Sequence, residues 1–281
     1  MSIPESYYSQ IATQAASLSI LPGWYPFFAK SIYQRSQIIE SKSPGNLSHS
    51  TFFNNKGNYY RGLTANLSMQ PLFPMTDWIL NTLLKKIQQA NQRDPNIAER
   101  ISAGFITGTT TVILANPYEV TVIASQKYQE SSYKAFKRVL NCSGVKGLYT
   151  GAIPMAIRNG TFISSLLVTT PALQKKINHL IPGSGKAHDI ATMVLASTIP
   201  ASAYICVVVP LDFMAIMRQS DPSGKVYTSA LQTLKAAYHK HGRGAFKAGL
   251  GNRLIACTIE MAGFNLLKNF YLEKFTTSAR G

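Results

Sequence analysis

Three segments of this 281-residue chain share one pattern, in which an apolar run meets a proline and then an acidic residue or its replacement. These segments are residues 25–28, 116–119 and 209–212, and their prolines are Pro26, Pro117 and Pro210. The prolines are separated by 91 and 93 residues, which is a nearly constant period. Self-similarity of this kind indicates a structure assembled from three similar units.

A second block follows each proline segment at a similar distance. Residues 56–63, 145–151 and 244–249 each place an aromatic residue shortly before a glycine, ahead of a new apolar stretch. Two blocks that recur in step are difficult to attribute to chance. We therefore divide the chain into three repeats, residues 1–97, 98–186 and 187–281, which together form one domain.

Each repeat predicts a helix, a loop that holds a short helix, and a second helix. The first helices are expected at residues 6–37, 98–127 and 188–219, and the second helices at 63–90, 152–178 and 249–273. Helices of this length suffice to cross a bilayer, so the sequence predicts an all-α membrane protein with six transmembrane helices. We expect a kink at each motif proline, because proline removes one backbone hydrogen bond. Gly104 and Gly108 form a GxxxG pair that favours close helix packing.

The composition supports helices that line a watery cavity. Charged residues make up only 14% of the chain and hydrophobic residues 46%, whereas about a quarter of the residues in soluble domains are charged. Yet no run of 18 or more residues is purely apolar, and the mean hydropathy is only +0.01. Helices around an aqueous pathway have this composition, since only their outward faces must be apolar.

The charge balance points to an anionic partner. The 28 Lys and Arg residues outnumber the 12 Asp and Glu residues, which gives a formal net charge of +16. Such an excess fits nucleic acid, an acidic lipid surface or an anionic solute. Nucleic acid is disfavoured, because the basic residues are not gathered on one helix or arm and no zinc-finger or RNA-recognition signature is present.

Motifs for catalysis and metal binding are missing from the sequence. Cys142, Cys206 and Cys257 stand far apart with no histidine at ligand spacing, so neither a disulfide framework nor a metal site is expected. Residues 183–186 resemble a phosphate-binding loop only superficially, because Ala187 stands where that loop needs a hydroxyl. No nucleophile elbow or zinc-protease motif occurs. We therefore expect a protein that is not an enzyme and that uses no cofactor.

The proline segments and the aromatic–glycine blocks resemble the signature of the mitochondrial carrier family over essentially the whole chain. The resemblance implies a threefold pseudosymmetric bundle with short matrix-side helices, a central solute site and alternating access. It also implies a multi-pass monomer in the mitochondrial inner membrane, with an anionic lipid such as cardiolipin at the matrix side. Two origins stay open: a diverged paralogue, or a copy acquired by an intracellular bacterium that acts in host mitochondria.

Ionisable residues at membrane depth usually line a pathway, and the second helices contain Asp77, Arg158, Arg253 and Glu260. An arginine binds phosphate or carboxylate through paired, charge-assisted bonds. Alternatively, Arg158 forms a structural ion pair with Asp77 or Glu260, and Arg253 snorkels from its helix start. Matched onto the family's contact points, the resemblance implies a substrate site formed by Arg158, Asn159, Phe162, Arg253, Met69 and Gln70.

The resemblance also implies a matrix gate that contains Pro26, Pro117, Glu119, Gln126, Pro210, Asp212 and Gln219. The family closes this gate by ion pairs, but Phe28 replaces the first acid here and the three motif bases are Ser31, Val122 and Ala215. The opposite gate is eroded as well, with Thr82, Pro171 and Leu267 near the expected acids. We expect Glu119 and Asp212 to face water, find polar neighbours or bind a proton. Fewer gate ion pairs lead us to the hypothesis of loosened exchange coupling.

The substrate class stays open at this stage. Residues 60–67 and 219–247 resemble ADP/ATP carriers, which favours a nucleotide such as ATP or ADP. However, Arg158 followed by Asn159 looks like the contact pattern of carboxylate carriers, so a carboxylate or keto acid is the alternative. A non-transporting membrane adaptor or basic helical scaffold is the alternative of another class.

Overall fold

The computed structural model describes residues 5–36, 60–221, 229–242 and 250–278. Every regular element in these ranges is helical, which confirms the prediction of an all-α protein. The helices are α1 (Glu5–Ser36), α3 (Leu63–Met69), α4 (Leu72–Asn91), α5 (Ile97–Tyr128), α6 (Ser132–Gly147), α7 (Ala152–Ser164), η3 (Ser165–Thr169), α8 (Thr170–Leu180), α9 (Lys186–Gln219), α10 (Ala230–His241) and α12 (Leu250–Ser278). Residues 56–59 and 244–249 of the aromatic–glycine blocks, and residues 222–228 of the segment that resembles ADP/ATP carriers, lie outside the described residues.

The first helix of each predicted repeat lies where the sequence places it. The ends of α1, α5 and α9 fall within two residues of the predicted ranges. Local capping explains the start of α5, where Asn96 Oδ1 accepts from the Glu99 backbone at 2.8 Å and Glu99 Oε2 accepts from the Asn96 backbone at 2.8 Å. This reciprocal pair satisfies two backbone donors that a helix start would otherwise leave free.

Two of the three second helices are interrupted, so the prediction of continuous helices at residues 63–90 and 152–178 is wrong in this respect. Pro71 has no N–H to continue the ladder, and α3 ends with a tighter bond from Gln70 N to Leu67 O at 3.1 Å before α4 begins. In the second case the π-helix η3 separates α7 from α8. In the third repeat the second helix, α12, is continuous from Leu250 to Ser278.

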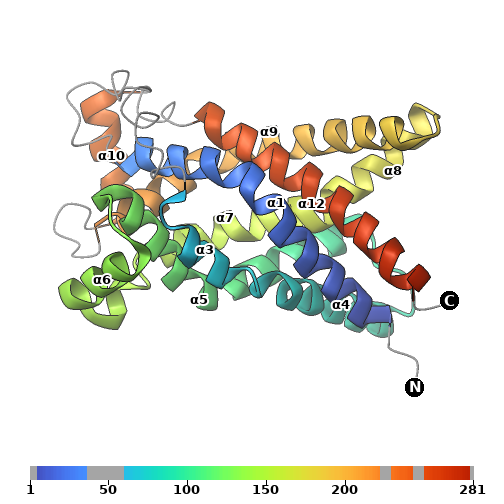
Figure 1. Cartoon of the computed structure of the whole chain (residues 1–281), viewed down its shortest axis with the longest axis horizontal. Coiled ribbons are helices and arrows are strands. Elements are labelled where there is room, and N and C mark those ends of the chain that lie inside the picture. The colour runs from blue at the N-terminus through green and yellow to red at the C-terminus, as the bar shows by residue number, and fades with distance from the viewer. Residues whose placement is uncertain (1–4, 37–59, 222–228, 243–249, 279–281) are drawn as a thin grey trace.

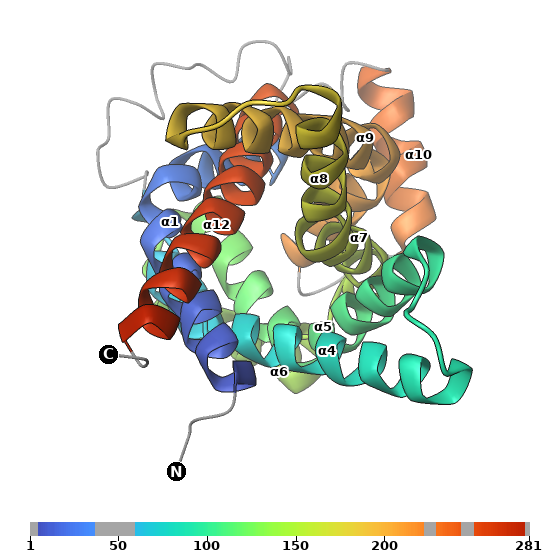
Figure 2. The same cartoon turned by 90° about the vertical axis from the view of Figure 1, so that its right-hand side faces the viewer.

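The long helices surround a common axis (Figure 2). The start of α1 and the end of α12 lie at one end of the bundle, and α6 and α10 lie at the other (Figure 1). Helix α1 packs along α12, and α5 packs along α7, which brings the first and last helices of the chain side by side. This arrangement leaves the inward faces of several helices around one central region.

The motif prolines lie inside α1, α5 and α9. In α9 the segments Lys186–Ile205 and Val209–Gln219 meet at 66°, where Pro210 cannot donate to the carbonyl four residues earlier. This bent pair meets a length and hydropathy criterion for a membrane span, whereas no single helix among the described residues does so. The predicted kink is therefore evident in α9.

Close packing of α5 on α7 depends on glycine. A Cβ atom at Gly108 would lie 2.6 Å from the Asn159 carbonyl oxygen, and one at Gly160 would lie 2.8 Å from the Phe105 carbonyl oxygen. Gly104 is almost as tight, with 3.0 Å to Ser164 Cα. The GxxxG prediction is confirmed, because only a residue without Cβ permits this backbone approach.

Candidate functional site

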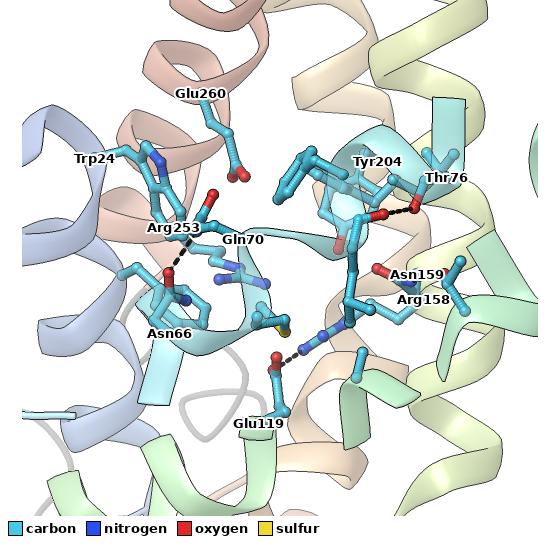
Figure 3. A pocket seen from close by; sticks show the side chains of 18 residues that line it. Trp24, Asn66, Gln70, Thr76, Glu119, Arg158, Asn159, Tyr204, Arg253 and Glu260 are labelled. Atoms are coloured by element: carbon cyan, nitrogen blue, oxygen red, sulfur yellow. Dashed lines mark hydrogen bonds and ion pairs between the residues drawn. The ribbon is translucent and has the colours of Figure 1, made fainter. Parts of the chain in front are cut away.

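A cavity of about 90 Å³ lies among the helices, with walls from α1, α3, α4, α5, α7, α9 and α12 (Figure 3). It holds one basic pair, Arg158 and Arg253, together with several aromatic rings. All six residues predicted to contact substrate line this cavity: Met69, Gln70, Arg158, Asn159, Phe162 and Arg253. The structure thus brings together side chains from distant parts of the chain.

Arg158 joins two acids of the predicted gate. Its Nη1 atom lies 2.7 Å from Glu119 Oε1 and 3.0 Å from Asp212 Oδ1. The three side chains come from α7, α5 and α9, and each is almost fully buried. A buried charge is tolerated only when it is paired, so one guanidinium holds the two helices α5 and α9 together.

Arg253 forms the second part of this network. Its Nη2 atom lies 3.4 Å from Asp212 Oδ1, and its guanidinium carbon lies 4.5 Å from the centre of the Phe28 ring. A cation over an aromatic face is attracted by the ring's negative quadrupole. Phe28 replaces the first gate acid, and it still binds a cation, through the face of its ring. The Nε atom of Arg253 is buried without a hydrogen-bond partner among the described residues.

The structural alternatives for the two arginines are wrong in their partners. Arg158 pairs with neither Asp77 nor Glu260. Asp77 instead accepts from Lys268 Nζ at 2.7 Å and from Ser9 Oγ at 2.9 Å. Arg253 is only 8% exposed, so it does not snorkel to a surface. Of the three options for Glu119 and Asp212, the structure shows polar neighbours.

The remaining predicted contact residues also serve helix packing. Asn159 Nδ2 donates to the Gly108 carbonyl at 2.8 Å, which ties α7 to α5. The Phe162 ring meets Tyr204 edge to face, with centroids 5.6 Å apart. Both side chains line the cavity and, like the two arginines, already have partners within the protein.

The two glutamines of the predicted gate brace helix junctions. Gln126 donates to the Arg61 carbonyl, which also accepts from Tyr25 Oη at 2.7 Å just before α3 begins. Gln219 donates to Asn116 Oδ1 at 3.1 Å and thereby ties α9 to α5. Their contacts go to these junctions, whereas the gate acids bind arginines.

The positions of the lost motif bases are filled by close packing. The Ser31 hydroxyl donates to the carbonyl of Phe28 in its own helix, at 2.8 Å. Gly62 and Gly151 begin α3 and α7 with φ of 80° and 74°, and a Cβ there would lie 3.3 Å from Val122 Cα and 3.2 Å from the Ala215 carbonyl oxygen respectively. Small or apolar side chains at Val122 and Ala215 therefore allow the second helices to start directly against α5 and α9.

A second cavity, of about 470 Å³, lies at the end of the bundle that holds the start of α1 and the start of α5. Its charged lining is Asp77, Arg100, Lys175 and Lys268, so basic side chains are in excess. Such a lining attracts anions. The sequence indicated only the loss of acids at this end and missed Lys268, because its partner is 191 residues away.

Metal ligation finds no support in the described residues, where no group of three or more His, Cys, Asp or Glu side chains could hold an ion. Cys142 is exposed and Cys257 is buried, each as a free thiol. The chemistry of the central cavity is therefore that of arginines, carboxylates and amides.

Comparison with known proteins relates this arrangement to membrane carriers. A family model described as mitochondrial carrier protein matches residues 93–179. The chain is 25% identical over 206 residues to a Homo sapiens protein named "Putative mitochondrial transporter UCP3", which covers 68% of this chain and 64% of that protein. It is 21% identical over 228 residues to the Oryctolagus cuniculus protein named mitochondrial brown fat uncoupling protein 1, covering 76% and 71%. It is 25% identical over 199 residues to the Danio rerio protein named dicarboxylate carrier UCP2, covering 68% and 63%.

The matched regions span slightly less than two thirds of the Homo sapiens and Danio rerio relatives. The helical architecture, the paired arginines in a central cavity and these similarities agree with one another. Residues 93–179 are therefore similar to the mitochondrial carrier family, and more than two thirds of the chain is similar to the named mitochondrial proteins.

Proposed function

We propose that this protein is a carrier-type transporter that moves an anionic metabolite across the mitochondrial inner membrane by alternating access. The observation that carries the proposal is the presence of Arg158 and Arg253 in one cavity between the long helices. Two guanidinium groups are a suitable receptor for phosphate or carboxylate oxygens. The protein would act as a transporter and not as an enzyme.

The ion pairs suggest how the solute and the gate communicate. Arg158 belongs to the predicted substrate site, yet it is bound to Glu119 and Asp212. A solute anion that approaches Arg158 would compete with these two carboxylates. Weakening of the two ion pairs would release α5 from α9. When the solute leaves, the ion pairs would form again and hold α5 and α9 together. This exchange of partners is a physical route to alternating access.

The six transmembrane spans and the threefold repeat are part of the proposal. The starts of α3 and α7 are built alike, with Gly62 and Gly151 packed against α5 and α9 respectively. In the same way Tyr25 and Asn116, each directly before a motif proline, bond to the carbonyls of Arg61 and Leu148 at 2.7 and 2.6 Å. Such matching junctions support the relation between the first and second repeats.

The substrate is an anion of one of two classes. A nucleotide such as ATP or ADP is favoured by the local resemblance to ADP/ATP carriers. A carboxylate or keto acid is favoured by Arg158 followed by Asn159, and by the relative named as a dicarboxylate carrier. Uptake of labelled nucleotides and carboxylates into proteoliposomes separates the two classes. A properly inserted protein that takes up no anion would overturn the proposal and favour the adaptor or scaffold.

Exchange coupling is proposed to be looser than in a strict antiporter. The arginine network connects α5 and α9 through two acids, but α1 contributes Phe28 in place of an acid. Apolar packing of Tyr25, Phe28 and Ile32 against Val122 and Ile216 closes α1 onto its neighbours. Since fewer ion pairs must break, we expect uptake into vesicles without internal substrate. A strict requirement for counter-substrate would refute this part.

An anionic lipid such as cardiolipin is the proposed partner at the matrix side, with the protein as a monomer. A third cavity, of about 350 Å³, lies at the start of α6 and is lined by Arg61, Glu130 and Ser132 among others, with Glu130 already paired to Arg138. The N-terminus of a helix presents free backbone N–H groups to an anion. Thermal stability with and without added cardiolipin, and the mass of the detergent-solubilised particle, test both statements.

A further inference from the structure

One side of the central cavity presents hydrogen-bond acceptors that have no donor. Glu260 of α12 lines the cavity, and Figure 3 shows its carboxylate pointing inward. Within the described part of the chain it forms no ion pair or hydrogen bond. Gln70 is 1% exposed, and its Nε2 donates to Asn66 Oδ1 at 2.8 Å while its Oε1 is buried without a partner. A buried acceptor without a donor, such as Gln70 Oε1, is unusual in native proteins and calls for an explanation.

The same cavity also presents a donor that has no acceptor. Arg253 Nε is buried and unpartnered among the described residues, although the same guanidinium contacts Asp212 through Nη2. The cavity therefore offers one set of groups that suits an anion and another that suits a hydrogen-bond donor.

The charge balance sharpens this asymmetry. Arg158 and Arg253 are matched in number by the carboxylates of Glu119 and Asp212, with which they form ion pairs. Glu260 adds a third carboxyl group to this region and, within the described residues, has no arginine of its own. An anion that carries no donating group would leave Glu260 and Gln70 Oε1 without a hydrogen-bond donor, which is costly where water is scarce.

The two sets of groups are separated along one helix. Arg253 and Glu260 are seven residues apart on α12, and seven residues correspond to about two turns and a rise of about 10 Å. Two full turns also return to nearly the same helix face, which is why both residues line the cavity. A ligand that uses both must therefore carry its donor several bonds away from its anionic group.

We propose that the solute is an anion that also carries an amino nitrogen several bonds from its charged oxygens, and that Glu260 is the residue that selects for this nitrogen. The anionic group binds Arg253 and Arg158, while Glu260 and Gln70 accept hydrogen bonds from the nitrogen. The inference rests on the proposed transport of an anionic metabolite. Nucleotides with an exocyclic amine and amino-dicarboxylates share this chemistry.

Two matched pairs of solutes distinguish these sources. ATP is compared with ITP, in which an oxygen replaces the amino group of the base, and glutamate is compared with glutarate, which lacks the amine. Uptake into proteoliposomes is measured below saturation, and ligand-induced shifts of the melting temperature are measured in detergent. We expect the amino member of one pair to be preferred at least tenfold, and the pair that shows the preference identifies the source.

Variants of Glu260 then assign the preference to this side chain. Glu260→Leu should remove the preference by lowering uptake of the amino member alone, and Glu260→Gln, which keeps an acceptor, should retain part of it. Asp189→Asn, at the exposed start of α9, is the matched control that should change neither member. Equal uptake of both members by the wild type, or an equal loss of both in Glu260→Leu, would overturn the inference. A Glu260 that only binds a proton would give the first of these results.

Failure of this inference differs from failure of the proposed function. If both members of a pair are transported alike, the protein is a carrier and Glu260 does not select an amine. If the melting temperature shifts only with the amino member but no solute is taken up, the ligand class stands and transport falls. Uptake therefore tests transport, and the shift of the melting temperature tests the ligand class.

Discussion

The Nη1 atom of Arg158 lies 2.7 Å from Glu119 Oε1, so a residue of the predicted substrate site is bound directly to a residue of the predicted gate. The same nitrogen lies 3.0 Å from Asp212 Oδ1 on a third helix. The first helices have lost their motif bases, and Arg158 of α7 pairs with the two acids instead. The cation bound to these acids therefore lies where a solute anion is expected. Under the proposed function, solute recognition and gate release would depend on one side chain.

Arg158→Ala should abolish anion uptake and lower stability. Removal of one partner leaves Glu119 and Asp212 with one fewer buried cation, and breaking a buried pair in this way typically costs about 3–5 kcal/mol. Uptake in proteoliposomes and thermal unfolding in detergent measure the two effects. Arg93→Ala, which breaks only an exposed pair with Glu99, is the control and should leave both nearly unchanged. Unaltered uptake in Arg158→Ala would remove this arginine from the site.

A triple variant separates binding from stability. Arg158→Met combined with Glu119→Gln and Asp212→Asn removes the cation and its two carboxylate charges together. Replacing a buried ion network by neutral groups is often neutral or stabilising, so the melting temperature should recover in part relative to Arg158→Ala. The recovery is only partial because Asp212→Asn also removes the carboxylate that pairs with Arg253. Uptake should stay lost, because Arg158 is absent. Recovery of uptake in the triple variant would show that Arg158 acts through stability alone.

Gly108→Ala should disrupt the contact between α5 and α7. The new Cβ would lie 2.6 Å from the Asn159 carbonyl oxygen, so the helices must separate, at a typical cost of about 1–3 kcal/mol for overpacking. Gly23→Ala is the matched control, because its Cβ would meet only Ile259 Cγ2 at 3.6 Å. Thermal unfolding compares the two, and equal melting temperatures would contradict the predicted role of close packing.

Asn265→Leu should weaken the link between α12 and the π-helix. Asn265 Nδ2 donates to the Leu166 carbonyl at 3.0 Å and to the Met261 carbonyl at 2.9 Å, and all are buried. Loss of the donor leaves the Leu166 carbonyl without this partner, which typically costs about 1–3 kcal/mol. Thr82→Ala, which removes an exposed bond within one helix, should have little effect on the melting temperature. The opposite ranking would argue against the link.

Acidification should release the surface pair between Glu130 and Arg138. Hydrogen bonding to Arg138 holds the pKa of the Glu130 carboxyl below its ordinary value, and the same bond raises the pKa of Arg138. A depressed carboxyl pKa stabilises the folded state above the unfolded pKa, and this contribution is lost as the pH falls through the folded pKa. For an exposed pair it amounts to no more than about 1 kcal/mol. The difference in melting temperature between wild type and Arg138→Gln should therefore shrink below about pH 4, and a constant difference would contradict the assignment.

The sequence by itself determined the helical class and the ends of the three first helices, and its family resemblance pointed to six of the residues around the central cavity. These features depend on local rules, such as the apolar runs, the capping of α5 by Asn96 and Glu99, and the motif prolines. The interruption of a second helix at Pro71 follows the same rule and could have been predicted from it. The π-helix between α7 and α8 has no comparable local signal.

Only the tertiary structure decided which charges meet. Arg158 finds Glu119 and Asp212 across 39 and 54 residues, and Lys268 finds Asp77 across 191 residues. Such pairing depends on the relative rotation of packed helices and on the burial that makes an unpaired charge costly, and neither is encoded in the spacing of residues along one helix. The same three-dimensional constraint leaves Glu260 in the cavity without a cation partner among the described residues, which the sequence showed only as an acid within a helix.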